Sequence, residues 1–380
     1  MIRKPLPYFS IVLPVKNEHR VVGRLLESLS NLTYPPEKLE IVIVEDGSSD
    51  GTFEICSQFA ALHTNVKLLQ RSVSNGKPSA LNYAIKHCSG EIIGFFDADA
   101  VPTADTLSKA ASYFVDPSVA AVQGRNLSIN SNENMLTRLI TYEETIMCDA
   151  YLQGKETLGL FVNLRGSCQF IRDSVLKQLG GFDEAFLSED IEISARITEK
   201  GYRIRYCSDL RSWQEAPADF RTFLKQRTRW YTGYLQVAFK YKRLLTRVTR
   251  KSVDAEIAMF APIVGAISLV SFSAAFLATT FLSYSFNTVL KWLLNLSVIA
   301  TLLTLLACGF ALVYFSNPKR VRNLFWVPFL YGYLNLEVFL TLYAGVLVVS
   351  RRYTKWTKTE KSGAIANPDF QFENPINPNK

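Results

Sequence analysis

The feature that most limits how this chain can fold is a change of sequence pattern near Asp254. After that residue come three apolar stretches, roughly residues 255–284, 289–315 and 324–350. Each is longer than the ~20 residues that a helix needs to cross the hydrocarbon layer of a bilayer. One such stretch could be the core helix of a soluble protein, but three in succession, flanked by Lys and Arg, favour membrane helices.

The positive residues beside these stretches restrict their orientation in a membrane. Lys and Arg precede the first stretch, separate the second from the third at Lys319–Arg322, and follow the third at Arg351 and Arg352. Because positive clusters favour the cytoplasmic side, three crossings put the last cluster on the opposite side from the others. We expect three crossings, with a re-entrant or interfacial hairpin at 324–350 as the alternative. Glu337 supports the hairpin, because a carboxylate in hydrocarbon needs a partner or a water-lined cavity.

Before residue 125, short apolar runs alternate with helical patterns. Strands are expected at residues 9–13, 40–44, 66–69 and 91–96, and helices at 21–29, 52–62 and 80–87. This alternation is typical of βαβ units and of a mostly parallel sheet. Ligands bind such sheets beyond the carboxyl ends of the strands, so functional residues are expected in the loops that follow the strands.

The middle of the chain has a less regular pattern. A long helix is expected at 132–152, a strand at 169–171 and a helix at 189–200. No internal repeat or linker divides this region, so one soluble domain is expected. The predicted organisation is a soluble domain at 1–235, a basic interfacial helix at 236–253, a membrane domain of about three helices at 254–350, and a basic, then disordered tail at 351–380.

Charge and residue usage exclude several classes of protein. The net charge of +8 is concentrated at the edges of the apolar stretches, which suits a membrane surface better than nucleic acid. The six cysteines lie far apart without a C-x-x-C pair, and there are only three histidines. This pattern argues against a disulfide framework and against a zinc site. The Gly76-Lys77 pair is not part of a P-loop, because Arg71 stands where the first glycine of that motif belongs.

Acidic residues follow two of the expected strands. Glu45 and Asp46 come after the second strand, and Asp97 and Asp99 come after the fourth. Two carboxylates two residues apart on an extended chain point to the same side, where they repel each other unless a cation lies between them. Mg²⁺ accepts such oxygens and keeps positions open for phosphate. Each acidic group taken alone could also be an ordinary solvated turn.

Two more segments combine residue types that suit chemistry. Asp190 stands in the first turn of a helix, where it could act as a general base or merely stabilise the helix dipole. The segment Gln226–Trp230 has the pattern Q-x-x-R-W, in which Arg229 can bind a diphosphate and Trp230 can stack on a sugar ring. An interfacial helix with headgroup-facing Arg and Trp is the alternative for this segment.

In this order the motifs resemble those of the family 2 glycosyltransferases with the GT-A fold. The resemblance covers about residues 8–235 and rests on Val12–Glu18, Glu45–Ser48, Gly76-Lys77, Asp97–Asp99, Ser188–Asp190 and Gln226–Trp230. The chain is similar in particular to the membrane-embedded branch that contains cellulose, chitin, hyaluronan and poly-N-acetylglucosamine synthases and glucosylceramide synthase. The resemblance implies an α/β GT-A domain with a mostly parallel sheet, followed by C-terminal transmembrane helices.

The resemblance also implies a role for each motif residue. Asp190 would be the catalytic base that deprotonates the acceptor hydroxyl. The implied donor-binding residues are Glu45, Asp46, Lys77, Asp97, Asp99 and Arg229. Asp97 and Asp99 would also hold Mg²⁺ or Mn²⁺ on the diphosphate. The implied acceptor-binding residues are Glu189, Gln226 and Trp230.

The expected function is inverting, metal-dependent transfer of a sugar from a nucleotide sugar, expected to be a UDP-sugar, to a lipid or lipid-linked hydroxyl. The expected location is the cell membrane, as a multi-pass protein with its catalytic domain in the cytoplasm, in contact with membrane lipids and not with nucleic acid. A processive polysaccharide synthase that extends and extrudes a β-linked glycan is the main alternative, and a non-catalytic assembly subunit is a second. Arg165–Cys168 departs from the Gly-Ser-Gly-like stretch common in the family, which leaves acceptor specificity open.

Overall fold

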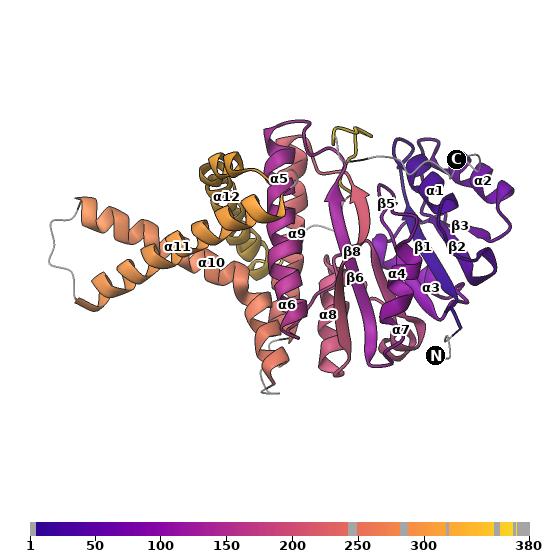
Figure 1. Cartoon of the computed structure of the whole chain (residues 1–380), viewed down its shortest axis with the longest axis horizontal. Coiled ribbons are helices and arrows are strands. Elements are labelled where there is room, and N and C mark those ends of the chain that lie inside the picture. Colours follow the sequence, from indigo (N-terminus) through magenta and orange to yellow (C-terminus); the bar gives the residue numbers. More distant parts are fainter. Residues whose placement is uncertain are drawn as a thin grey trace.

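The computed structural model describes residues 5–241, 249–281, 288–316, 319–352, 358–367 and 370. An α/β domain forms one end of the molecule and helices α10, α11 and α12 form the other, with α5 and α9 between them (Figure 1). The arrangement agrees with the expected change from a soluble to an apolar part of the chain.

The α/β domain is built on one sheet of eight strands in the order β3-β2-β1-β4-β7-β6-β8-β5. The strands are β1 (Phe9–Val15), β2 (Leu39–Glu45), β3 (Val66–Gln70), β4 (Ile92–Phe95), β5 (Val101–Pro102), β6 (Val119–Ser128), β7 (Gln169–Arg172) and β8 (Arg203–Gln214). The four strands expected before residue 125 and the strand at 169–171 are confirmed.

The sheet is mixed, which corrects the expectation of a mostly parallel one. Strands β1 to β4 pair in parallel, as do β6 and β8. Strand β7 is antiparallel to both β4 and β6, and β5 is antiparallel to β8. The pairing of Gln169 with Phe95 shows that β7 starts at the edge where β4 ends. It therefore runs in the opposite direction, away from the edge where ligands are expected.

Twelve α-helices and three short helices of other types make up the rest of the described structure. They are α1 (Val22–Ser30), η1 (Pro36–Lys38), α2 (Thr52–Leu62), α3 (Lys77–Ile85), α4 (Thr106–Tyr113), α5 (Met135–Thr145), η2 (Ile146–Leu152), α6 (Gln153–Thr157), α7 (Asp173–Leu179), α8 (Glu189–Glu199), α9 (Phe220–Tyr241), α10 (Arg250–Phe281), α11 (Thr288–Phe315), η4 (Val321–Trp326) and α12 (Val327–Val349). The long helix expected at 132–152 is present as α5 followed by η2, a π-helix. Helices of this type are frequent next to functional sites.

Hydrophobic side chains cover both faces of the sheet. On β1, Ile11 and Leu13 pack into one core with α1, and Val12 between them packs into a second core with α3. Successive residues of a strand point to opposite faces, so a strand that is buried on both sides reads as one continuous apolar run. This is why β1 and β2 could be recognised in the sequence.

Helix α9 lies close to the start of α8 because residue 233 is a glycine. A Cβ atom at Gly233 would lie 2.7 Å from the Cβ of Ser188 and 2.8 Å from its backbone nitrogen. Only a residue without a side chain allows this approach. The contact brings the Q-x-x-R-W segment, which lies on α9, next to the S-E-D segment at the start of α8.

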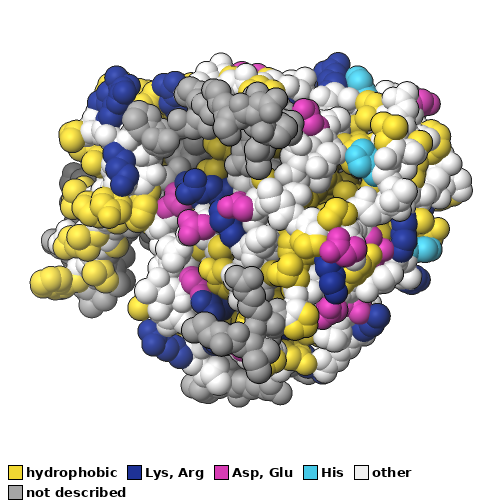
Figure 2. Space-filling model, turned by 45° about the vertical axis from the view of Figure 1, so that its right-hand side comes forward, with side chains coloured by type: hydrophobic (Ala, Val, Ile, Leu, Met, Phe, Trp, Pro, Cys, Tyr) yellow, Lys and Arg dark blue, Asp and Glu magenta, His cyan; other side chains and the backbone are white. Residues whose placement is uncertain are grey.

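Two helical segments of the described chain are long and apolar enough to cross a membrane, by length and composition. They are Asn295–Phe315, with a mean hydropathy of 2.4, and Val321–Val349, with 1.6. In the space-filling view hydrophobic side chains are prominent on the left-hand part of the molecule, while Asp and Glu side chains appear on the remainder of that face (Figure 2). The expected stretch 255–284 is helical as far as Phe281 but is not among the two, so three crossings remain a prediction.

The boundaries expected after residue 235 change. Residues 236–241 continue α9, residues 242–248 lie outside the described residues, and α10 begins at Arg250, so the interfacial helix expected at 236–253 is not a separate element in the described part. In the tail, residues 353–357, 368–369 and 371–380 lie outside the described residues. Residues 358–367, which we call the C-terminal strap, are ordered against the α/β domain. This corrects the expectation of disorder for that segment.

Candidate active site

A cavity of about 230 Å³ lies beyond the carboxyl ends of β1, β2 and β4. All the predicted site residues except Glu45 line it: Asp46, Lys77, Asp97, Asp99, Glu189, Asp190, Gln226, Arg229 and Trp230. They come from loops after β2 and β4 and from the starts or interiors of α3, α8 and α9. The fold therefore brings together motifs that are far apart in the sequence.

The turn after β2 separates Asp46 from Glu45. The carboxylate of Glu45 is buried inside the turn, where it accepts the backbone N–H of Ser48 at 2.5 Å. The carboxylate of Asp46 accepts the hydroxyl of Ser74 at 2.5 Å and lies 3.4 Å from the Arg71 guanidinium. Asp46 is thus held at the wall of the cavity, and Glu45 shapes the turn that carries it.

Lys77 lies between the two acidic motifs. Its Nζ is 2.6 Å from Asp97 and 3.4 Å from Glu189, and it donates to the carbonyl of Gly166 at 3.3 Å. Burial opposes the charged form of Lys77, but the carboxylates of Asp97 and Glu189 outweigh burial and raise the pKa above its usual range. Lys77 is therefore a fixed positive charge at the centre of the site.

Asp190 has the properties of a general base. It stands in the first turn of α8 and accepts the backbone N–H of Ile191 at 2.9 Å. Burial and the neighbouring charge of Glu189 raise the pKa of Asp190 to about 7, although Lys77 acts in the opposite direction. A carboxylate with a pKa near neutrality can both take and release a proton under physiological conditions.

The Q-x-x-R-W segment forms the opposite wall of the cavity from α9. Burial lowers the pKa of Arg229, while Glu189, Asp97 and Asp190 act to raise it, so this guanidinium lies within the electrostatic range of three site carboxylates. Gln226 is 8% exposed, and its Oε1 has no hydrogen-bond partner among the described residues. A buried amide oxygen that lines a cavity without a partner is suited to accept a hydrogen bond from a ligand.

One face of the Trp230 ring is already covered by the protein. The guanidinium carbon of Arg227 lies 4.4 Å from the ring centroid. Arg227 lies at the second position of the Q-x-x-R-W pattern, which the pattern leaves unspecified, and nothing in the sequence marked it as a site residue. Glu144, Arg165 and Tyr234 also line the cavity without having been predicted, and Arg165 pairs with Glu144 at 2.9 Å.

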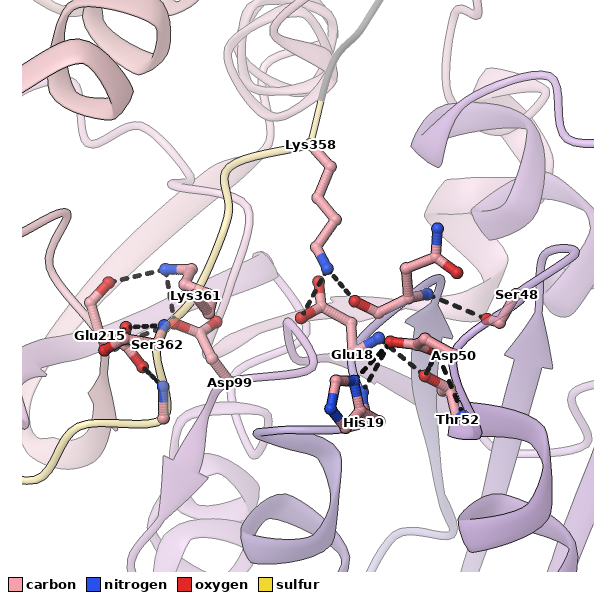
Figure 3. Close-up of polar contacts among 12 residues, drawn as sticks. Glu18, His19, Ser48, Asp50, Thr52, Asp99, Glu215, Lys358, Lys361 and Ser362 are labelled. Atoms are coloured by element: carbon pink, nitrogen blue, oxygen red, sulfur yellow. Dashed lines mark hydrogen bonds and ion pairs between the residues drawn. The ribbon is translucent and has the colours of Figure 1, made fainter. Parts of the chain in front are cut away.

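The C-terminal strap adds two lysines to the site (Figure 3). Lys361 lies 2.7 Å from the carboxylate of Asp99 and donates to the carbonyl of Glu215 at 2.6 Å. Lys358 lies 3.2 Å from the carboxylate of Glu18 and donates to the carbonyl of Asn17. Burial raises the pKa of Glu18 to about 8 even though Lys358 lowers it.

Glu215 anchors the strap to the site. Its Oε1 accepts the backbone N–H of Ser362 at 2.6 Å, and its Oε2 accepts that of Gly363 at 2.9 Å. The backbone N–H of Glu215 donates to Asp99 at 2.9 Å. Burial acts to raise the pKa of Asp99, but Lys361 and this N–H outweigh it and lower the pKa below its usual range. One residue thus holds both the strap and a carboxylate of the D-x-D motif.

The D-x-D carboxylates suit a hard divalent cation. Asp97 and Asp99 supply oxygen ligands, and each is paired with an ammonium group, from Lys77 and Lys361. In the structure, the positive charge beside each carboxylate is that of a lysine. No group of three or more His, Cys, Asp or Glu side chains in the described part is placed to hold a metal ion by itself, so such an ion would need ligands from substrate and water as well. Mg²⁺ is commonly bound in this way, by one or two carboxylates and substrate phosphates.

Comparison with known proteins identifies the family. A family model described as "Glycosyltransferase like family 2" matches residues 7–233, which include every motif of the cavity. The chain belongs to the family 2 glycosyltransferases.

Relatives of this glycosyltransferase carry several names. It is 29% identical over 379 residues to the probable glycosyltransferase YdaM of Bacillus subtilis, covering 94% of this chain and 88% of YdaM. It is 33% identical over 255 residues to a beta-monoglucosyldiacylglycerol synthase of Trichormus variabilis, covering 66% of this chain and 54% of that protein. It is 28% identical over 370 residues to a poly-beta-1,6-N-acetyl-D-glucosamine synthase of Staphylococcus epidermidis, covering 93% and 87%. The match spans about half the length of the beta-monoglucosyldiacylglycerol synthase.

A solved structure confirms the fold of the glycosyltransferase. The mannosyltransferase PcManGT from Pyrobaculum calidifontis, in complex with GDP-Man and Mn²⁺, matches 92% of this chain and 89% of that chain with a TM-score of 0.64 at 21% identity. The expected GT-A-like α/β architecture is therefore present in this glycosyltransferase.

Proposed function

We propose that this glycosyltransferase moves a sugar, with inversion, from a nucleotide-sugar donor to the hydroxyl of a lipid or lipid-linked acceptor at the cytoplasmic face of the cell membrane. The observation that supports the proposal most strongly is that Asp190 lies in the same cavity as the other motif residues. A buried carboxylate with a pKa of about 7 shares one cavity with the D-x-D carboxylates and with Trp230. A base, a donor site and an acceptor platform are thus within one space.

The donor would occupy the side of the cavity next to the sheet. Asp46 would contact the base or ribose, and the fixed charges of Lys77 and Arg229 would face the diphosphate. A UDP-sugar is the proposed donor, although the related mannosyltransferase PcManGT was solved with GDP-Man. Asp97 and Asp99 would hold Mg²⁺ or Mn²⁺, which when bound supplies positive charge to the diphosphate. That the PcManGT complex contains Mn²⁺ supports this assignment.

Transfer would proceed in one displacement. Asp190 takes the proton of the acceptor hydroxyl while the hydroxyl oxygen bonds to the anomeric carbon from the face opposite the nucleotide. The bond from that carbon to the diphosphate oxygen breaks, and the electron pair leaves with the nucleoside diphosphate, so the configuration inverts. Lys77 and Arg229 stabilise the negative charge that develops on the leaving group, because preorganised charges in a water-poor site act strongly on a transition state.

The acceptor would enter between α9 and the membrane part. Gln226 and Trp230 lie on α9, which packs against α12. Helix α12 belongs to the segment Val321–Val349, which is long and apolar enough to cross a membrane. An acceptor held at Trp230 would therefore be close to the place where a lipid could reach the cavity. Glu189, next to the proposed base Asp190, would also contact the acceptor. The beta-monoglucosyldiacylglycerol synthases among the relatives support a lipid acceptor.

A processive polysaccharide synthase is the second candidate. The specific observation that favours it is the similarity to a poly-beta-1,6-N-acetyl-D-glucosamine synthase over 93% of this chain. Both candidates use the same donor side and the same base, so the cavity alone does not separate them.

One experiment tests the proposal and separates the candidates. The full chain, reconstituted in lipid vesicles with Mg²⁺ or Mn²⁺, is incubated with radiolabelled UDP-sugars and GDP-mannose in turn. Label in the organic phase as a single glycolipid supports the lipid acceptor, whereas label in a high-molecular-weight glycan supports the synthase. Transfer from no donor, under conditions where the chain binds UDP, contradicts the proposed function. Asp190→Asn serves as the control for transfer that depends on the base.

A further inference from the structure

Arg227 is buried between the cavity and α12. Its side chain is 4% exposed, and its guanidinium pairs with Glu143 of α5. The same group donates to the hydroxyl of Tyr333 at 3.0 Å and lies 3.1 Å from the carboxylate of Glu337, both on α12. One side chain of α9 therefore contacts two other helices through charged or polar groups.

The partners of Arg227 also contact one another. The hydroxyl of Tyr333 lies 2.6 Å from Glu143 and 3.1 Å from Glu337. Glu143, Tyr333 and Glu337 thus form a closed cluster around the guanidinium, which we call the Arg227 cluster. Glu337 is the carboxylate whose presence in an apolar stretch required a partner, and Arg227 is that partner.

The other side of the guanidinium faces the acceptor platform. It lies 4.4 Å from the centroid of the Trp230 ring and 5.5 Å from that of Phe223. A guanidinium over an aromatic face is attracted to it and restricts the orientation of the ring.

The cluster is costly as a purely structural device. Burying a guanidinium and two carboxylates costs several kcal/mol per ion before their attraction repays it, and apolar side chains of similar size often stabilise a protein better. Ionisable residues within apolar membrane-type helices usually serve a function. Burial and Glu337 raise the pKa of Glu143 to about 7 although Arg227 lowers it. A role beyond stability therefore explains the cluster better than packing does.

We infer that Arg227 is a positioning residue for the acceptor, which fixes the Trp230 ring at the cavity wall and fastens it to α12 through Glu337. The inference rests on the proposed function, because it takes Trp230 as the acceptor platform. Arg227 contacts no reacting atom in this scheme. Its loss should change how the acceptor is held and leave the donor side intact.

The test compares Arg227→Met, Arg227→Lys and Glu337→Gln in the full chain. Arg227→Met should raise the KM for the acceptor about tenfold or more, while the affinity for UDP and Mn²⁺ stays within about twofold, which also shows that the variant is folded. Arg227→Lys should recover part of the loss, since it keeps the charge but not the planar group. Lys225→Met, on the exposed face of α9, is the matched control for loss of a positive charge and should leave the acceptor KM unchanged.

Two further measurements keep the inference testable apart from transfer. Glu337→Gln should also raise the acceptor KM. Adding it to Arg227→Met should raise that KM no further, because both changes remove the same contact, the ion pair between Arg227 and Glu337. Acrylamide quenching of Trp230, obtained by subtracting the signal of the matching Trp230→Phe protein, should increase in Arg227→Met.

The results separate the two proposals. If the wild-type chain transfers no sugar although it binds UDP, the proposed function fails, and with it the acceptor role of Arg227; the quenching of Trp230 then decides only whether Arg227 holds the Trp230 ring in place. If the wild type transfers sugar but Arg227→Met and Glu337→Gln leave both the acceptor KM and the quenching within about twofold, the positioning role is wrong. A fall in thermal stability with neither effect would make the Arg227 cluster structural only.

Discussion

The ammonium group of Lys361 lies 2.7 Å from the carboxylate of Asp99, although the two residues are far apart in the sequence. Because Asp99 is also a proposed ligand of the divalent cation, the lysine and the metal would compete for the same oxygen atoms. The occupancy of this carboxylate should therefore depend on the C-terminal strap.

Lys361→Met is expected to tighten the binding of Mn²⁺ by the donor-free chain. A hydrogen bond to a charged group contributes about 1.5–3 kcal/mol, and 1.4 kcal/mol corresponds to about tenfold in affinity, so a change of about tenfold is expected. Titration calorimetry with Mn²⁺ measures it. Lys358→Met, which removes a lysine paired with Glu18 instead, should cause a smaller change. Equal affinity in Lys361→Met and wild type would show that the lysine does not shield Asp99.

Asp190→Asn is expected to lower kcat by about 10²–10⁴-fold, the usual contribution of a general base. The amide keeps the size of the side chain but cannot take the proton of the acceptor. The affinity for UDP, measured on the same sample, should be nearly unchanged because the donor contacts come from other residues. Turnover close to that of the wild type would sink the catalytic role.

The rate of transfer is expected to rise with pH through about 7. Asp190 must be ionised to accept a proton, and its pKa is raised to about 7, so activity should fall about tenfold for each pH unit below that value. Glu189→Gln removes a negative charge that helps to raise this pKa, and should therefore move the acidic limb of the kcat/KM profile to lower pH. A limb that stays in place, or moves to higher pH, would contradict the pairing of these two carboxylates.

Removal of divalent metal is expected to abolish transfer, and added Mg²⁺ or Mn²⁺ to restore it. The reason is that the diphosphate would leave without the positive charge held by Asp97 and Asp99. Activity is measured in excess EDTA and after readdition of each metal, with Asp97→Asn as the variant that should need more metal. Unchanged activity in excess EDTA would remove both aspartates from this role.

Gly233→Ala is expected to destabilise the chain by roughly 1–3 kcal/mol, the usual cost of forcing extra atoms into a packed contact. A Cβ atom there would lie 2.7 Å from the Cβ of Ser188 and would push α9 away from the start of α8. Gly154→Ala is the matched control, since nothing lies within 4 Å of a Cβ at that helical position and alanine favours helices by about 1 kcal/mol. Thermal unfolding of both variants checks the prediction, and a melting temperature of Gly233→Ala at or above that of the wild type would contradict it.

Short-range patterns in the sequence predicted a large part of the site. Strands β1, β2 and β4 are mostly apolar because both of their faces are buried, and the acidic motifs come at the ends of β2 and β4. The adjacent pair Glu45 and Asp46 could not be resolved in the same way. Neighbouring residues on an extended chain point to opposite sides, so only one of the two reaches the cavity, and the pattern does not say which.

The parts that escaped prediction depend on long-range contacts. Strands β6 and β8 contain many polar residues that do not alternate regularly with apolar ones, so their sequences gave no clear strand pattern. The C-terminal strap has a polar composition typical of disorder, and its order depends on distant partners such as Glu215, which accepts two of its backbone N–H groups. Arg227 stands at an unspecified position of its motif, so its partners could be known only once α5 and α12 were placed beside α9.

In the proposed membrane location, the ion pair between Arg227 and Glu337 would connect the chemistry of the cavity to the thickness of the lipid layer. A membrane helix whose apolar length differs from the thickness of the bilayer adjusts by tilting. Tilting of α12 would move Glu337, and with it the guanidinium on which the Trp230 ring rests. Vesicles of longer or shorter acyl chains should therefore change how well this glycosyltransferase uses its acceptor, with no change in the sequence or in the donor.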